Sequence, residues 1–251
     1  MIRGLYTSAL GMITQMSRMD VVTDNIANVD TTGHKRDQVV SQSFTEELMK
    51  RLHDPGMRMF KDYPVGQVSQ GVFVDDIYTD FSPGTFRQTN GTLDLAMDGQ
   101  GFFCVDVNGT EMYTRDGSFT TLPDGTLVTS DGGHVKGQNG DILLPNGYIV
   151  IDENARVFVN GQYIDTLQMT DFSDKHTLRK TKDNYYTVTA ESEKVPYAGR
   201  VEQGYLENSN VSSVKEMVEM ITLSRAYETN ARMISVHDQT LARAVSDIGR
   251  R

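Results

Sequence analysis

The chain has 251 residues, 38% of them hydrophobic and 23% charged, which is long enough to bury a core in one or two domains. Its formal net charge is −10, and residues 61–200 hold twenty acidic against eleven basic side chains, which excludes the basic face of a nucleic-acid-binding protein. The single cysteine, Cys104, excludes an internal disulfide and a metal site made of several cysteines.

The beginning of the chain predicts neither a cleaved secretory signal nor a membrane anchor. The first twenty residues contain Arg3, Arg18 and Asp20 and lack a long uninterrupted apolar run. No other stretch is apolar over the roughly 20 residues that a helix needs to cross a bilayer. The residues alone therefore indicate a cytoplasmic protein, unless export uses a route without a cleaved signal.

Residues 3–29 are predicted to form a long helix that ends in the turn-forming residues 29–33. A period of 3.5 residues places apolar side chains along one seam of such a helix, and another helix must cover that seam. The seam follows alternating steps of four and three residues, is broken at Thr23, and consists of Leu5, Ala9, Met12, Met16, Met19 and Ile26.

The stretch that follows carries weaker patterns. Residues 37–52 indicate a second, shorter helix with apolar residues at mixed spacing, and Asp54, Pro55 and Gly56 end it. Residues 57–79 show no dominant pattern and are expected to form an extended excursion with short strands.

The centre of the chain is predicted to be a β domain. Twelve of the 22 glycines lie between residues 91 and 161, many of them directly after Asn or Asp, in pairs that favour tight hairpins. This spacing indicates an antiparallel sandwich or a partly open barrel. A polar loop is expected over residues 171–183, and the predicted strands are 102–107, 126–129, 148–151, 156–159, 163–169 and 185–189.

A second long helix is predicted over residues 213–248, from a capping box of Ser213 and Glu216 to a stop at Gly249. The two helices can cover each other's seams within one chain, or helices of other copies can cover them, and both arrangements stay open. The seam of this helix is broken at Ser224 and Asp238 and consists of Met217, Met220, Tyr227, Ala231, Ile234, Leu241, Val245 and Ile248.

The residues predict no enzyme active site, no metal site and no cofactor. The five histidines are scattered, without the three- or four-residue spacing of a helical metal site. Asp75 and Asp76 are adjacent, as are Asp152 and Glu153, so each pair would point to opposite faces of a strand and would not converge. No serine, threonine or cysteine has a recognisable base partner in the sequence.

Four segments resemble motifs of the bacterial flagellar axial proteins, in that family's order and across nearly the whole chain. Two features depart from the family, because His34 stands where phenylalanine is common and residues 54–79 are individual. The chain length and the third motif point to the rod proteins of the basal body, with the distal rod subunit favoured over a proximal one. The matching segments are residues 25–36, 95–103, 113–119 and 203–211, and the last continues through Glu216, residues 220–221 and residues 225–230.

Together the patterns predict an α+β protein. Its N- and C-terminal helices pair as a coiled coil, and they frame a β-rich central domain. The expected division is a helical domain of residues 1–33 and 209–251, a connecting segment of residues 34–84 and 193–208, and an outer β domain of residues 85–192.

The resemblance implies a structural subunit that polymerises through its terminal helices into the hollow drive shaft of the rod, which transmits torque to the hook. It implies a place in the basal body after export through the flagellar type III apparatus without a cleaved signal peptide. The implied partners are further copies of the chain, other rod and hook subunits and the export apparatus, without nucleic acid or membrane insertion. The implied assembly interface is Leu5, Met12, Met16, Met19, Asn25, Ile26, Asn28, Met217, Met220, Tyr227, Ile234, Leu241 and Val245.

Two other functions stay open from the sequence. A hook-type or hook-associated axial subunit would share the terminal helices and differ in its outer domains. A secreted wall hydrolase or sugar-binding β domain would use the helices only to oligomerise. The hydrolase would need converging carboxylates or a nucleophile in a groove of the β domain.

Overall fold

The computed structural model describes residues 2–44, 47–51, 63–68, 71–181, 184–189 and 192–249. The chain forms two compact units. The first comprises Met1–Asp24, Asp37–Tyr78 and Val214–Arg251, and the second comprises Asn25–Arg36 and Thr79–Ser213. Residues 52–62 and 69–70 lie outside the described residues, and they include the predicted helix stop at residues 54–56 and part of the stretch 57–79 that shows no dominant pattern.

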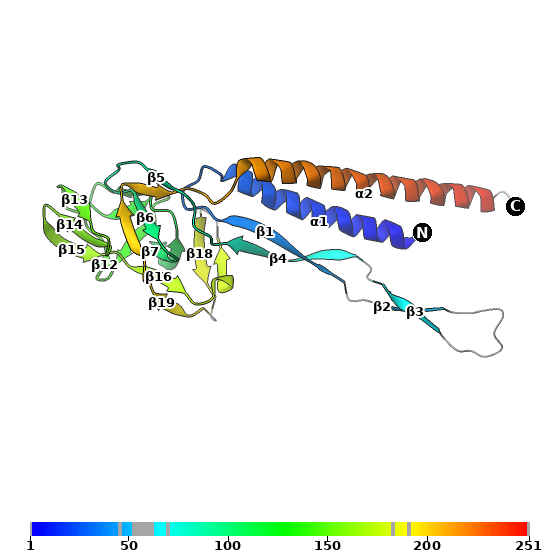
Figure 1. The fold of residues 1–251 in the computed structure, drawn as a ribbon, viewed down its shortest axis with the longest axis horizontal. Helices are drawn as coiled ribbons and strands as arrows, with labels where there is room; N and C mark the ends of the chain where they lie inside the picture. The colour runs from blue at the N-terminus through cyan, green and yellow to red at the C-terminus, as the bar shows by residue number, and fades with distance from the viewer. Residues whose placement is uncertain are drawn as a thin grey trace. The chain divides into compact units, whose positions relative to one another are not determined.

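The first unit contains two long terminal helices, α1 (Ile2–Ala27) and α2 (Ser213–Ile248). Both predicted helices are thus confirmed, and α2 has the predicted bounds. The helices lie side by side, with the two ends of the chain at the same end of the pair (Figure 1). The predicted α+β class with paired terminal helices is confirmed.

A two-stranded ribbon packs against α1 in the same unit. It is formed by β1 (Arg36–Ser43) and β4 (Val72–Asp80), while β2 (Glu47–Arg51) pairs antiparallel with β3 (Tyr63–Val68). The Thr14 hydroxyl donates to the carbonyl oxygen of Val72 at 3.2 Å. Arg18 Nη2 donates to Ser41 Oγ at 2.7 Å, so the ribbon covers one side of α1.

The prediction of a helix over residues 37–52 is wrong, because this stretch forms β1 and β2. Along β1, residues 37, 39 and 41 are less exposed than residues 38, 40 and 42, which is the two-residue period of a strand. β1 pairs with a strand that begins only at Val72. Local spacing carries no signal of such a distant partner, and the pairing overrides the weak helical pattern.

Every strand pairing in the described part of the second unit is antiparallel, and no closed barrel forms there. The largest sheet runs β17-β18-β8-β7-β11-β10-β9, with β12 on β11, and with β16 on β7 and β19 on β16. A second sheet runs β13-β14-β15, and β6 with β20 and β5 with β21 form ribbons. The predicted β-rich central domain is confirmed. The bounds are β5 (Phe86–Gln88), β6 (Leu95–Asp98), β7 (Phe102–Val107), β8 (Thr110–Thr114), β9 (Phe119–Thr121), β10 (Leu127–Thr129), β11 (His134–Gly137), β12 (Gly140–Asp141), β13 (Ile149–Ile151), β14 (Arg156–Val159), β15 (Gln162–Thr166), β16 (Met169–Phe172), β17 (Leu178–Lys180), β18 (Tyr185–Val188), β19 (Lys194–Pro196), β20 (Arg200–Gln203) and β21 (Tyr205–Glu207).

Two Asn-Gly pairs form the tight hairpins that the sequence predicts. Asn108 and Gly109 join β7 to β8 with φ angles of 53° and 80°, and Asn160 and Gly161 join β14 to β15 with 53° and 81°. Two successive positive φ values belong to the turn whose twist matches that of the flanking strands. Asn and Gly reach this conformation at low cost.

The predicted polar loop over residues 171–183 is wrong in part. β16 extends into it, a 3-10 turn (η1) spans Lys175–Thr177, and β17 pairs antiparallel with β18. Leu178 is the reason, because it is buried in a core cluster together with Tyr186 of β18. Phe172 and Leu178 are the apolar residues of this polar stretch, too weak a signal to predict a strand, but Leu178 suffices to seat an edge strand on a sheet that already exists.

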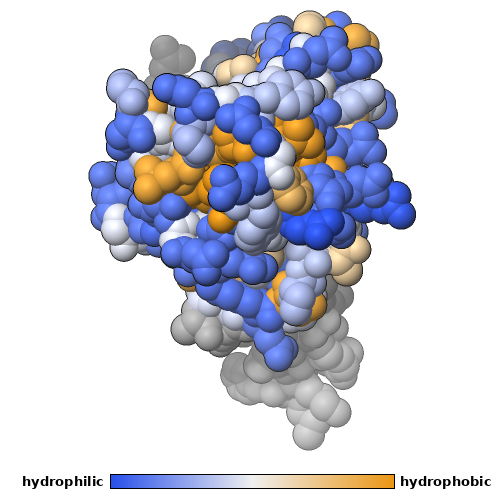
Figure 2. Space-filling view, turned by 90° about the vertical axis from the view of Figure 1, so that its left-hand side faces the viewer, coloured by the Kyte–Doolittle hydropathy of each residue, from blue (hydrophilic) through white to orange (hydrophobic). Residues whose placement is uncertain are grey.

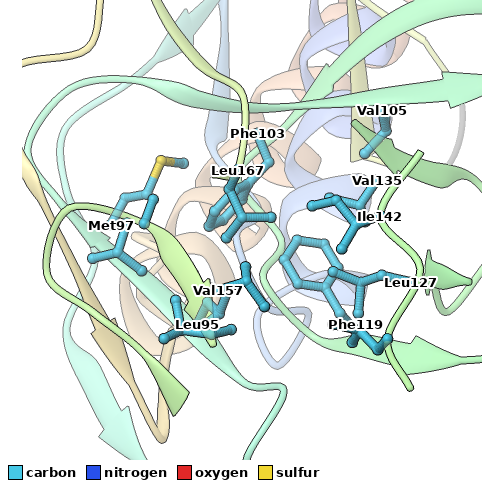
Figure 3. Close-up of a cluster of buried hydrophobic side chains, with 14 of the residues drawn as sticks. Leu95, Met97, Phe103, Val105, Phe119, Leu127, Val135, Ile142, Val157 and Leu167 are labelled. Atoms are coloured by element: carbon cyan, nitrogen blue, oxygen red, sulfur yellow. The ribbon is translucent and has the colours of Figure 1, made fainter. Parts of the chain in front are cut away.

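Strand β7 is buried on both faces and lies between two cores. Phe103 and Val105 point into the larger cluster, and the alternate residues Phe102 and Cys104 point into a smaller aromatic one. The larger cluster also takes side chains from the sheet β13-β14-β15, such as Val157, so it joins the two sheets (Figure 3). This two-layer packing is what makes the second unit a compact body.

The outward face of the sheet β13-β14-β15 carries exposed apolar side chains. The strand register places Val150 beside Phe158 and Phe158 beside Tyr163, and Tyr148 lies two residues before Val150. Tyr148 is 72% exposed and Tyr163 is 47% exposed. Figure 2 shows hydrophobic residues gathered among hydrophilic ones on the side of the molecule that carries these strands in Figure 1.

Candidate functional site

The two terminal helices contact each other in an antiparallel register. A Cβ atom added to Gly4 would lie 2.6 Å from Nε2 of His237, and one added to Gly11 would lie 3.0 Å from Nδ2 of Asn230. Seven residues forward on α1 thus correspond to seven residues backward on α2. The two glycines let polar side chains of α2 approach the backbone of α1 closely.

Among the less exposed positions of α2, which also include Ser224, Ala226 and Ala231, one set forms a continuous stripe at alternating steps of four and three residues. Met220, Tyr227, Ile234 and Leu241 belong to both the stripe and the predicted seam. The other stripe positions lie one residue before the other seam positions, and some of them are polar. Met217 and Val245 of the predicted seam are instead 50% and 71% exposed. The stripe consists of Glu216, Met220, Leu223, Tyr227, Asn230, Ile234, His237, Leu241 and Ala244.

The predicted assembly residues of α1 differ in exposure. Met16 is 57% exposed, whereas Leu5, Met12, Met19 and Ile26 are half-buried. Thr14 and Val22, which the predicted seam does not include, are buried. As contacts between copies, all these seam residues stay predictions.

Apolar side chains also remain exposed on the helix surfaces outside the stripe. Val214, Met217, Val218 and Ile221 begin α2 at positions i, i+3, i+4 and i+7, which lie on one helix face. They are between 50% and 69% exposed. We call these four residues the outer α2 face. On α1, the exposed apolar side chains include Tyr6, Ile13 and Met16.

The segment after α1 belongs to the second unit and is held within it by close contacts. Gly33 has φ +67°, and its N–H donates to the carbonyl oxygen of Glu207 at 2.8 Å. The Thr32 hydroxyl donates to Asp116 Oδ1 at 2.6 Å. Of the two predicted asparagines, Asn28 accepts from the Thr31 hydroxyl at 3.2 Å. Asn25 is fully buried.

The carboxylate of Glu207 is the centre of a buried ionic cluster. Its Oε1 accepts from Lys35 Nζ at 2.6 Å and from the N–H of Gly84 at 2.9 Å, and its Oε2 lies 3.4 Å from Arg115 Nη1. The side chains of Lys35, Arg115 and Glu207 are each at most 1% exposed. Burial lowers the pKa of Lys35, although the nearby Glu207 carboxylate opposes this shift. We call Lys35, Arg115 and Glu207 the ionic cluster.

The ionic cluster joins three of the four sequence motifs, and the sequence interpretation assigned no role to its residues. Lys35 and Glu207 are 172 positions apart, so no local pattern connects them. The available signal is the presence of charged residues inside motifs that otherwise form turns and strands. A buried charge needs a partner, and that need predicts pairing without identifying the partner.

The adjacent carboxylates of the β domain, Asp152 and Glu153, each form an ion pair with a neighbouring arginine. Asp152 accepts from Arg156 Nη2, and Glu153 Oε2 lies 3.3 Å from Arg200 Nη1. The guanidinium of Arg156 lowers the pKa of Asp152. Within the described ranges, no group of three or more His, Cys, Asp or Glu side chains is placed to hold a metal ion. No helix in that part of the chain is long and apolar enough to span a membrane.

Models of three protein families match the chain. They are "Flagella basal body rod protein" over residues 5–35, "Flagellar hook protein FlgE/F/G D1 domain" over residues 96–162 and "Flagellar basal body rod FlgEFG protein C-terminal" over residues 202–247. The first and third matches include Lys35, Glu207 and most of both helices.

The chain is also similar over its whole length to curated flagellar proteins. It is 32% identical to the flagellar basal-body rod protein FlgF of Caulobacter vibrioides, over 98% of this chain and 98% of the relative. It is 33% identical to the rod protein FlgG of the same bacterium, over 95% and 97%. It is 31% identical to FlgG of Bacillus subtilis, over 98% and 99%.

Proposed function

The chain belongs to the flagellar basal-body rod protein family and is a structural subunit of the rod, and we propose that it polymerises with further copies through its terminal helices. In the polymer, α1 and α2 of many copies form the inner wall of a hollow shaft, and residues 85–192 form the outer domain. The shaft transmits torque to the hook.

The observation that carries the proposal is the outer α2 face. Val214, Met217, Val218 and Ile221 remain exposed although α2 already packs on α1 through a different stripe. Burying such a side chain contributes roughly 1.5–3 kcal/mol, and each copy in a polymer repeats the gain. Ile13 and Met16 of α1 are equally uncovered and supply apolar surface for a neighbouring copy.

Further partners follow from the family rather than from the isolated chain. Other rod and hook subunits would adjoin this subunit in the basal body, and the flagellar type III apparatus would export it. The distal position in the rod, favoured from the sequence, agrees with relatives named FlgG, and a relative named FlgF is equally similar. Electron microscopy of basal bodies that carry a tagged copy measures this position directly.

Two variants with the same introduced side chain test the polymerisation. Ile221→Glu places a carboxylate on the outer α2 face, where burial against a second copy would desolvate it. Lys215→Glu places a carboxylate at an exposed position away from that face. We expect both purified chains to keep the wild-type circular dichroism spectrum. In cells whose only copy is the variant, Ile221→Glu should abolish rod assembly and swimming, and Lys215→Glu should not.

Normal rods built from Ile221→Glu would contradict the proposal, because a buried carboxylate without a partner costs several kcal/mol in every copy.

The proposed role needs no catalysis. Asp152 and Glu153 each pair with an arginine, which leaves them poorly suited to act together as acid and base. The wall-hydrolase alternative predicts cell-wall hydrolysis by the purified chain, lost in the double variant Asp152→Asn with Glu153→Gln. We expect no hydrolysis by either protein and normal swimming of cells with the double variant.

A further inference from the structure

The chain passes between its two units at four points. These are the bonds between Asp24 and Asn25, Arg36 and Asp37, Tyr78 and Thr79, and Ser213 and Val214. Any twisting force that reaches the second unit through the polypeptide must therefore arrive through four short segments. Besides the contact of α1 with α2 and the pairing of β1 with β4 in the first unit, contacts within the second unit join these segments.

Glu207 joins two of these segments to the segment in which it lies itself. Glu207 is six residues before Ser213, and it binds Lys35 next to the second connection and the N–H of Gly84 beyond the third. Lys35 Nζ also donates to the carbonyl oxygen of Ser82 at 2.8 Å. The opposite oxygen of the carboxylate faces Arg115, which donates through Nη2 to the carbonyl oxygen of Gly99 at 2.7 Å.

Asn210 repeats this arrangement with a neutral side chain. Its Oδ1 accepts from the N–H of Arg36 at 2.8 Å. Its Nδ2 donates to the carbonyl oxygens of Asp80 at 2.8 Å and Ser82 at 3.2 Å. The amide thus connects the same three segments as Glu207, three residues closer to α2.

The first connection is held through the same stretch of chain. Residues 25–36 carry it at one end and the second connection at the other. Between them, Gly33 binds the backbone of Glu207, and Thr32 accepts through its carbonyl oxygen from Asn184 Nδ2 at 3.0 Å. The three stretches of the second unit that carry the connections, residues 25–36, 80–84 and 207–213, therefore contact one another through Glu207 and Asn210.

A buried ion pair is a poor source of net stability, because desolvation offsets the attraction between the charges. It does define geometry, since Lys35 and Arg115 cannot move away from Glu207 without leaving a buried charge unpaired. We propose that Glu207 and Asn210 are positioning residues that hold the three stretches carrying the connections in one fixed arrangement, through which the second unit takes up the twisting load of the rod. The inference that these stretches carry load rests on the proposed function, whereas the inference that their arrangement is fixed does not.

Hydrogen exchange of the purified full-length chain tests the fixed arrangement. Glu207→Gln keeps the shape of the side chain and removes its charge, and Asn210→Ala removes the amide without exposing a buried charge. Asp141→Asn is the control, because Asp141 pairs with Lys136 at an exposed site of the same unit. We expect amide exchange in residues 31–36 and 80–84 to become about tenfold faster in both variants and to stay unchanged in the control.

Exchange in β7 and β8 separates local loosening from unfolding. It should stay at the wild-type rate in Asn210→Ala, so this variant decides the matter even if Glu207→Gln fails to fold. Wild-type exchange of residues 31–36 and 80–84 in Asn210→Ala would overturn the proposal.

Swimming at two viscosities tests the load, with each variant as the only copy in the cell. We expect Glu207→Gln and Asn210→Ala to lose more speed than wild type when viscosity rises, and Asp141→Asn to lose the same fraction as wild type. Equal losses in all four strains would overturn the load-carrying role. Normal swimming of a strain without the gene would instead refute the proposed function, and the exchange experiment would still decide the fixed arrangement.

Discussion

At the scale of single residues, Gly33 shows two separate requirements for glycine at one position. Its φ of +67° is costly for a residue with a side chain, and an added Cβ would lie 2.4 Å from the backbone nitrogen of Asp116. Gly132 has a φ of +84° with nothing within 4 Å of the added atom. The two glycines therefore share a positive φ, and only Gly33 also lies close to the backbone of another segment.

Alanine substitution at both glycines should separate these requirements. Gly132→Ala should lower the free energy of unfolding by about 1 kcal/mol, the cost of the positive φ alone. Gly33→Ala should lower it by roughly 2–4 kcal/mol, because backbone atoms must also move. Urea denaturation of the two variants measures both values. Equal losses would mean that the segment after α1 yields easily and that its contacts are loose.

Lys35 makes the stability of the second unit depend on pH in a specified direction. Burial lowers its pKa in the folded chain, while Glu207 and Asp80 oppose the shift and Arg115 adds to it. A lysine whose folded pKa is lowered contributes stability above its unfolded pKa of about 10.4 and loses it as pH falls through the folded value. The unfolded chain binds the proton more tightly, so this contribution rises with pH.

Lys35→Met should remove that dependence. We expect the free energy of unfolding of the wild-type chain, minus that of Lys35→Met, to increase between pH 7 and pH 10. Urea denaturation at several pH values measures the difference, in which groups common to both chains cancel. A difference that stays constant or falls over this range would show that Glu207 holds the Lys35 charge more strongly than burial opposes it.

At the scale of elements, each terminal helix carries more than one contact face. The stripe on α2 that faces α1 includes Glu216, Asn230 and His237, so the pairing within one chain buries polar groups. The outer α2 face carries apolar residues and stays exposed. The intrachain contact therefore uses a face that includes polar groups and leaves the apolar surface at the start of α2 exposed.

Adjacent aspartate substitutions distinguish the faces in the isolated chain. Ile234 lies on the stripe and is half-buried, whereas Met233 is 47% exposed. Ile234→Asp should accelerate amide exchange along α1 and α2, since a carboxylate there would have to be desolvated or the helices would have to part. Met233→Asp should leave exchange near the wild-type rate. Equal effects of the two variants would contradict the assignment of the faces.

At the scale of the whole molecule, the two units differ in how much apolar surface they cover. Almost all of the fully buried apolar side chains lie in the second unit, whereas in the first unit only Val22 and Leu223 are in that class among the described residues. The helices gain little from burial in a single chain, and a helix without packing is only marginally stable in water. The cores around β7 stabilise the second unit without help from other copies.

The helices of a dilute monomer should therefore exchange their amide hydrogens much faster than the second unit. We expect rapid exchange in residues 1–24 and 214–251 and strong protection in β7, β8 and β11. Mass spectrometry on a chain shown to be monomeric by light scattering measures both. Protection of the helices as strong as that of β7 would mean that pairing within one chain already covers them.

The sequence by itself determined the features that depend on residues close together in the chain. The bounds of α2 follow from its capping residues and from the absence of glycine and proline before Gly249. The Asn108-Gly109 and Asn160-Gly161 hairpins follow from the positive φ that these residues tolerate. The four motifs sufficed to recognise the family. Each of these signals is contained in a short window, so reading it requires no knowledge of a distant partner.

The tertiary structure alone decided which of two locally acceptable outcomes occurred. Residues 37–43 and 47–51 became strands because partner strands between Tyr63 and Asp80 were available to pair with them. On α2, Asn230 and His237 face α1 one residue before the positions that the predicted seam assigns, because Gly11 and Gly4 let these side chains approach the backbone of α1 closely. Lys35 found Glu207 across 172 positions. Hydrogen bonding and desolvation act through space, and local spacing does not record which distant group will satisfy a buried charge or an unpaired strand.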